Sequence, residues 1–204
     1  IDEIIRGMFL EGQNGDNWSI KDPAPMLAEM RLIKNEGDWK MGLQQAIDIS
    51  AKAHIEAFKA IKPGMYEYEV QAAFEYVYRK NGSPRNAYPC IVGSGPNSCT
   101  LHYEKNTRQL RSGEVVLMDC GAEYGYYAAD VTRTVPVDGK FTTEQREIYQ
   151  LVLDAQNAAI QTVKPGVTKS VLDSVMNTIL GSGLVKLGFI KNQKDLHIFA
   201  LHGF

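Results

Sequence analysis

Two aspartates with ten residues between them constrain this chain more than any other feature. Asp119 directly follows the apolar run Val115–Met118, and a run of that length and composition indicates a buried strand. A second run carries Asp130, and Tyr124-Gly125 between the runs is typical of a two-residue hairpin turn, with glycine where positive φ is needed. With the turn at that place, Asp119 pairs directly with Asp130 on neighbouring strands.

Residues that pair directly across two strands point to the same face of a sheet, with Cβ atoms about 4.5–5.5 Å apart. Either aspartate alone is typical of a turn or a helix cap. The apolar flanks of the pair, however, predict that both carboxylates are buried, and buried carboxylates are rarely left without a partner. We therefore expect a cation between Asp119 and Asp130. Their oxygens suit magnesium, calcium or manganese, and also zinc or cobalt when histidine joins them.

Composition excludes several other classes of protein. Apolar residues make up 44% of the 204 residues and charged residues 23%, which is typical of a globular chain. The net charge of −2 favours no polyanion, so we expect neither nucleic acid nor an anionic membrane as a partner. No apolar run approaches the roughly 20 residues of a membrane span.

Cysteine usage indicates a reducing compartment. Cys90, Cys99 and Cys120 form an odd, sparse set without C-x-x-C spacing, which argues against a disulfide framework and a structural zinc site. Cys120 follows Asp119 and therefore faces the other side of a continuing strand, which predicts a packed thiol. With no secretory leader visible, these features predict a cytoplasmic protein.

Apolar periodicity predicts helices over residues 36–60, 66–80, 142–163 and 169–180. The segment AFKAIKPGMYEYEV (57–70) is similar to AIQTVKPGVTKSVL (159–172), and each copy reads as helix, Lys-Pro-Gly stop, helix. This repeat predicts a duplicated α+β architecture with a site between its halves. Short strands are expected over residues 87–92, 100–103 and 196–201.

The two ends of the chain suggest a piece of a longer protein. Residues 1–25 are rich in glycine, asparagine and proline and are expected to be the end of a preceding domain and a linker. Residues 26–204 are expected to form one domain whose C-terminal part lies beyond Phe204.

Several motifs together resemble the aminopeptidase P family of Xaa-Pro aminopeptidases. They are IVGSGPNSCTLHY, then VVLMDCGAEYGYYAADVTRTVPVDGKFTTEQREIYQLVL, and the ending LHGF. The wider group includes prolidase, creatinase and methionine aminopeptidase. The resemblance extends from about Met26 to Phe204, nearly all of the chain, and implies the pita-bread fold, an α+β fold with pseudo-twofold duplicated halves, here incomplete at the C-terminus.

The resemblance also implies roles for individual residues. Asp119 would bind one divalent metal ion and Asp130 would bridge two, usually Mn²⁺, with Zn²⁺ or Co²⁺ as alternatives. A hydroxide bridging the ions would attack the peptide carbonyl. His102 would contact the substrate or the transition state, and His202 would line the substrate pocket near the proline; the alternatives are a hydrogen-bonded structural histidine and a packed one.

The implied activity is release of the N-terminal residue from peptides with proline in second position. Thr132 and Arg133 are expected to orient the ligands, whereas His54 and His197 have no motif context and are expected to be ordinary core or surface histidines. The family's three other metal ligands, a histidine and two glutamates, would lie beyond Phe204, so the fragment alone is expected to be inactive. A homo-oligomer, dimer or tetramer, is expected for the full-length protein. The alternatives are a prolidase-like dipeptidase, a creatinase-like hydrolase and a metal-free peptide-binding or protein-binding module.

Overall fold

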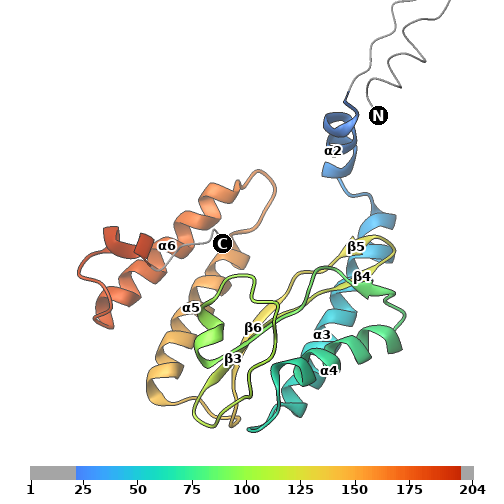
Figure 1. The fold of residues 1–204 in the computed structure, drawn as a ribbon. Helices are drawn as coiled ribbons and strands as arrows, with labels where there is room; N and C mark the ends of the chain where they lie inside the picture. The colour runs from blue at the N-terminus through green and yellow to red at the C-terminus, as the bar shows by residue number, and fades with distance from the viewer. Residues whose placement is uncertain (1–21, 199–204) are drawn as a thin grey trace, which may run out of the picture.

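The computed structural model describes residues 22–198, which form two packed helix pairs and two small antiparallel sheets (Figure 1). The helices are α2 (Ala24–Leu32), the π-helix η1 (Asp38–Leu43), α3 (Gln44–Ala60), α4 (Glu67–Lys80), α5 (Thr143–Thr162), α6 (Lys169–Lys186) and the 3₁₀ helices η2 (Gly95–Cys99) and η3 (Gln193–Ile198). The strands are β1 (Arg85–Asn86), β2 (Ile91–Ser94), β3 (Val115–Asp119), β4 (Ala122–Tyr124), β5 (Tyr127–Ala128) and β6 (Thr132–Pro136).

The internal repeat corresponds to the two helix pairs. α3 packs against α4, and α5 against α6 (Figure 1). The Lys-Pro-Gly stops end in Gly64 at φ 91° and Gly166 at φ 88°, in the left-handed region that glycine adopts without a steric penalty. The prediction of two similar helical hairpins is therefore confirmed within residues 22–198.

Local sequence explains where α5 begins, but not where α6 ends. The Thr142 hydroxyl caps α5 by accepting a hydrogen bond from the Gln145 backbone N–H at 3.2 Å, and the Gln145 side chain bonds back to the Thr142 N–H at 3.0 Å. The prediction that the helix starting at residue 169 ends at residue 180 is wrong, because α6 continues to Lys186. Gly183 packs closely against α5, since a Cβ there would lie 2.2 Å from Leu151 Cδ1 and that side chain would have to move.

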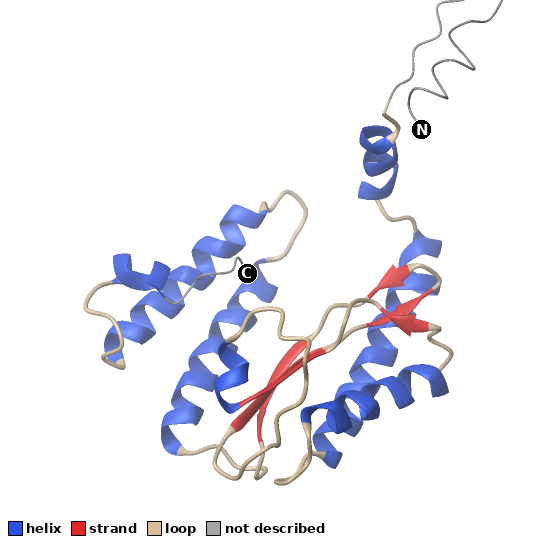
Figure 2. Cartoon of the chain, in the orientation of Figure 1, coloured by secondary structure: helices blue, strands red, loops and turns tan. Residues whose placement is uncertain are grey.

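The strands form sheets of order β2-β3-β6 and β1-β4-β5, both antiparallel (Figure 2). A strand over residues 87–92 is only partly confirmed, because residues 87–90 separate β1 from β2. The prediction of a strand over 100–103 is wrong, since 100–102 form a bend and a turn and 103 belongs to no strand. Residues 196–198 belong to η3 rather than to a strand, and 199–201 lie outside the described residues.

The hairpin exists, but its register differs from the prediction. Asp119 pairs with Thr132, not with Asp130, and the turn lies at Gly125-Tyr126. Both turn residues have positive φ, 57° and 68°, as a type I′ turn requires. A tyrosine rarely adopts this conformation, so the sequence alone favoured a turn one residue earlier. Here the Tyr126 N–H donates to Glu123 Oε1 at 3.2 Å, which stabilises the turn.

The described residues contain two hydrophobic cores. The larger lies between the α3–α4 pair and the strands, and receives Val116 and Met118 from β3. The smaller joins α5, α6 and η3 around Ala155, Leu180 and Leu196. Burial alternates along β3, so Asp119 lies on the strand face that points away from the larger core.

None of the helices within residues 22–198 has the length and apolar character that crossing a membrane requires. Helix α2 has no buried residue and stands away from the helix pairs and sheets (Figure 1).

Candidate functional site

Asp119 and Asp130 converge on one hydroxyl group, that of Tyr88. The Tyr88 hydroxyl lies 2.5 Å from Asp119 Oδ1 and 3.2 Å from Asp130 Oδ1. A phenol has one proton to donate, so the two carboxylates share a single donor. The structure thus brings the two aspartates together as predicted, through a residue that the sequence did not single out.

The two carboxylates still converge because the observed pairing differs from the predicted one by two residues, an even number. Cys120 N bonds to Val131 O and Ala129 N to Ala122 O, so the strand register continues through the bend between the two sheets and places Gly121 opposite Asp130. Asp119 and Asp130 are therefore diagonal neighbours rather than direct partners. Residues two positions apart on a strand share a face, so the two carboxylates still lie on the same side.

Gly121 allows the close approach of the chain segments that carry the site. A Cβ at this position would lie 1.9 Å from the carbonyl oxygen of Ala129 and 3.0 Å from the ring of Tyr88. Any larger residue would therefore push β4 and the Asp130 segment apart.

The prediction that both carboxylates are buried is wrong. Asp119 is half-buried and Asp130 is exposed, because they lie on the strand face that the larger core does not cover. Burial raises the pKa of the Tyr88 phenol, and the hydrogen bond to Asp119 and the charges of both carboxylates raise it further. Tyr88 therefore stays protonated, and so able to donate, throughout the physiological pH range.

The donor set fits a divalent cation. Within residues 22–198, the second oxygen of neither carboxylate accepts a hydrogen bond, and neither aspartate forms an ion pair. Two negative groups this close are stabilised by a cation, and their free oxygens are hard ligands of the kind that Mn²⁺ accepts. The described residues hold no group of three or more histidine, cysteine, aspartate or glutamate side chains that could complete a site.

His102 lies on an exposed loop between η2 and β3, in the left-handed backbone conformation at φ 50°. His202, the predicted pocket residue, lies outside the described residues. Thr132 is the direct strand partner of Asp119. Arg133 is exposed and donates to the carbonyl oxygen of Thr132 at 2.8 Å.

The loop that carries His102 is tied to a buried glutamate that the sequence showed only as an acidic residue near a helix start. Glu67, the first residue of α4, has no exposed surface and accepts hydrogen bonds from the loop. Burial raises the pKa of the Glu67 carboxyl, but the N–H groups of Arg108 and Ser94 and the hydroxyls of Ser94 and Tyr103 together bring that pKa below its usual value.

The residues predicted to be ordinary lie in the core or on the surface. Cys120 is fully buried on the core side of the sheet, as its position after Asp119 predicts, and burial raises the pKa of its thiol. His54 is buried in α3, where its ring packs edge-on against Phe74 at a centroid distance of 4.7 Å. His197 is exposed, and its Nδ1 lies 2.8 Å from the carbonyl oxygen of Lys194.

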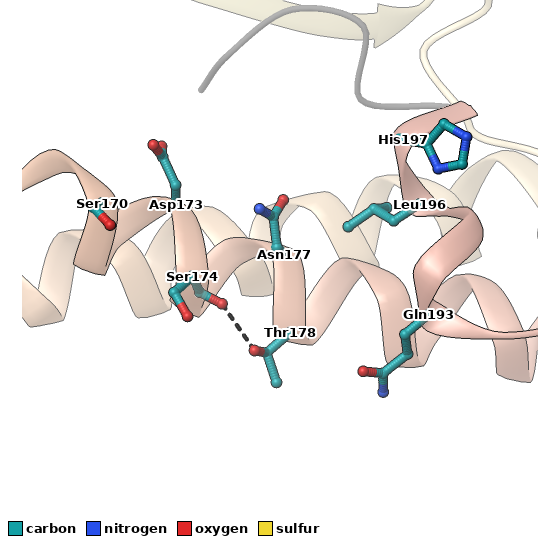
Figure 3. Close-up of a pocket in the computed structure, with 8 residues that line it drawn as sticks. All are labelled: Ser170, Asp173, Ser174, Asn177, Thr178, Gln193, Leu196 and His197. Atoms are coloured by element: carbon teal, nitrogen blue, oxygen red, sulfur yellow. Dashed lines mark hydrogen bonds between the residues drawn. The ribbon is translucent and has the colours of Figure 1, made fainter.

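A separate polar groove of about 660 Å³ lies over α6 and η3 (Figure 3). Its lining is mostly hydroxyl and amide side chains, with Asp173, which pairs with Lys169, and His197. It shares no residue with the aspartate pair, so we assign it no part in the site.

Comparison with known proteins identifies relatives over most of the chain. Residues 41–203 match the sequence model of metallopeptidase family M24. The chain is 40% identical over 205 aligned residues to the Xaa-Pro aminopeptidase of Haemophilus influenzae, an alignment that covers 97% of this chain and 47% of the relative.

Solved structures of aminopeptidase P have the same fold as this chain. A putative aminopeptidase P from Bacillus anthracis superposes with a TM-score of 0.90 at 29% identity, over 99% of this chain and 46% of that one. Zinc-substituted Escherichia coli aminopeptidase P in complex with product superposes with a TM-score of 0.83 at 40% identity, over 89% of this chain and 41% of that one. The predicted pita-bread architecture is therefore confirmed, and the chain spans about half the length of the relatives it matches.

Proposed function

Because the chain belongs to metallopeptidase family M24, we propose that its aspartate pair is part of the metal centre of an Xaa-Pro aminopeptidase. Such an enzyme releases the N-terminal residue of peptides in which proline is second. The observation that carries the proposal is the convergence of two carboxylates on Tyr88, with their second oxygens unengaged among the described residues. Similarity to the Haemophilus Xaa-Pro aminopeptidase supports the substrate class.

Each residue has a distinct role in this proposal. Asp119 and Asp130 hold two divalent ions, Mn²⁺ in preference to Zn²⁺ or Co²⁺, and Tyr88 orients both carboxylates. When bound, the ions supply Lewis acidity and lower the pKa of water. His102 contacts the substrate near the reacting carbonyl, and His202 lines the pocket for proline.

We further propose that a histidine and two glutamates from sequence outside these 204 residues complete the centre. The lack of a three-ligand group within residues 22–198 supports this, as does the length of the relatives, about twice that of the chain. On this proposal residues 26–204 belong to the catalytic domain and residues 1–25 to a preceding domain and linker. The 204 residues alone would then not hydrolyse peptides. The homo-oligomer and the cytoplasmic location stay predictions.

The test compares Asp130→Ala with Asp154→Ala in a polypeptide of the relatives' length that carries these residues. Asp154 is an exposed aspartate of α5 whose carboxylate accepts from the Gln150 side chain. Bound Mn²⁺ and hydrolysis of an Xaa-Pro tripeptide are measured on the same samples. We expect Asp130→Ala to lose both and Asp154→Ala to keep both. Full metal content and activity in Asp130→Ala would refute the assignment.

A further inference from the structure

The backbone around His102 is held in a conformation that its own residues disfavour. His102 and Asn106 both have positive φ, 50° and 48°, in a loop where neither is glycine. Such conformations are strained for residues other than glycine and persist only where the surroundings enforce them. The His102 loop, which we define as residues 95–109, must therefore be fixed by contacts from outside itself.

One buried carboxylate supplies several of those contacts. Glu67 Oε1 accepts from the Ser94 N–H and the Ser94 hydroxyl, both at 2.7 Å, and from Asn97 Nδ2 at 3.1 Å. Glu67 Oε2 accepts from the Tyr103 hydroxyl at 2.8 Å and the Arg108 N–H at 2.9 Å. The bonded groups lie on both sides of His102 along the chain, and Tyr103 is its immediate neighbour.

A second, smaller anchor supports the same loop. The buried Asn106 side chain accepts from the Val92 N–H at 3.0 Å and donates to the Cys90 carbonyl and to Gln71 Oε1, both at 2.8 Å. This anchor fixes the loop after His102 but makes no contact with Ser94 or Asn97 before it. Asn97 Nδ2 donates to the Tyr103 hydroxyl at 2.8 Å and Arg108 Nη1 to the Ser94 hydroxyl at 2.9 Å, and Glu67 accepts from all four of these residues, so it lies at the centre of the bonds that join the two sides.

The charge on Glu67 is needed for this arrangement. The Arg108 guanidinium forms its paired hydrogen bonds with Glu114 at 2.6 and 2.7 Å, so Glu67 is stabilised by uncharged donors and by its place in the first turn of α4. A glutamine at 67 would place an NH₂ group where Oε1 or Oε2 of Glu67 now accepts hydrogen bonds. An NH₂ group cannot accept from these donors, so buried donors would be left unpaired.

We propose that Glu67 is a positioning residue, which sets the place of His102 by clamping the loop on both sides of it. The inference rests on the proposed role of His102 at the substrate. Glu67 touches neither substrate nor metal in this account and acts only through the loop.

A double-mutant cycle in the longer polypeptide tests this. We measure kcat and KM for an Xaa-Pro tripeptide, together with bound Mn²⁺, in wild type, Glu67→Gln, His102→Ala and the double variant. Glu67→Gln is expected to lower kcat by about tenfold or more, with metal content unchanged. The double variant is expected to match His102→Ala, because a residue that acts through another adds nothing once that other is removed.

A matched control separates positioning from general destabilisation. Val70→Ala alters the same helix at an equally buried residue whose side chain cannot hydrogen-bond to the loop. It is expected to lower the melting temperature and keep kcat. If Glu67→Gln does not fold, Tyr103→Phe removes one of the five donors and is expected to give a smaller loss, again absent in the His102→Ala background.

The outcomes are distinguishable. Independent, multiplicative losses from Glu67→Gln and His102→Ala, or a wild-type kcat in Glu67→Gln, would overturn the positioning role and leave the proposed function standing. A wild-type kcat in His102→Ala would overturn the role of His102 and this inference with it.

Discussion

The hydroxyl of Ser50 accepts a hydrogen bond from the backbone N–H of Ala122 at 2.9 Å, and so ties α3 to the first residue of β4. Ser50 has no exposed surface, and its own proton goes to the carbonyl oxygen of Ala46 at 2.8 Å. This bond joins residues that are far apart in sequence, and one of them, Ala122, lies three positions after Asp119. It holds the hairpin that carries both aspartates against the helix behind it.

Ser50→Ala is expected to lower the free energy of unfolding by about 1–3 kcal/mol, because the buried N–H of Ala122 loses its acceptor. Urea denaturation measures the change. Thr178→Val is the control, since its hydroxyl bonds to the Ser174 carbonyl on an exposed helix surface and should change stability by less than about 0.5 kcal/mol. Equal midpoints for the two variants would contradict the importance of this bond.

Gly121→Ala is expected to destabilise the protein by about 1–3 kcal/mol or more, because the new methyl group would overlap the Ala129 carbonyl oxygen. Thermal unfolding measures the loss. Gly181→Ala is a suitable comparison, since the nearest atom to its Cβ would be Gln193 Cγ at 3.3 Å and alanine favours the helix. A Gly121→Ala protein as stable as Gly181→Ala would show that the bend tolerates a side chain.

Tyr88→Phe is expected to weaken Mn²⁺ binding by about 10–100-fold, because the two carboxylates lose the donor that orients them. Isothermal titration of the longer polypeptide with Mn²⁺ gives the affinity directly. Tyr126→Phe removes a hydroxyl from an exposed turn tyrosine and should leave the affinity unchanged. Unaltered affinity in Tyr88→Phe would mean that the aspartates keep their orientation without the phenol.

Stability is expected to fall as the pH drops from 7.5 to 5.5, in part through His54. Burial lowers the pKa of His54, and the hydrogen bond to the Ser50 carbonyl only partly opposes this. The unfolded chain, with a histidine pKa of about 6.5, binds more protons than the folded chain below that pH, so acid favours unfolding. Urea midpoints measured across this range should vary less in His54→Gln. Parallel curves for the variant and the wild type would contradict the assignment to His54.

The sequence was informative where local chemistry decides the structure. The Lys-Pro-Gly stops and the packed thiol of Cys120 follow from neighbouring residues alone, and both are confirmed. The predicted register of the hairpin was wrong, because the observed register depends on Tyr126 adopting a left-handed conformation that is rare for tyrosine.

The partners of the site residues could not be predicted from pattern. Tyr88 precedes a proline between two short strands, and nothing in its neighbourhood distinguishes it from other tyrosines. Glu67 reads as an acidic residue in the first turn of a helix, and its burial becomes visible only when the His102 loop folds over it. Both act through residues distant in the chain, which periodicity does not report.

The diagonal arrangement of Asp119 and Asp130 limits how this chain can change length. A one-residue slip of the pairing between these strands would turn Asp130 to the opposite side of the sheet, whereas a two-residue slip would keep it on the side of Asp119. Insertions should therefore be tolerated in the loop at Gly125-Tyr126, where the pairing can be kept, whereas an extra residue within the paired segments should need a compensating bulge.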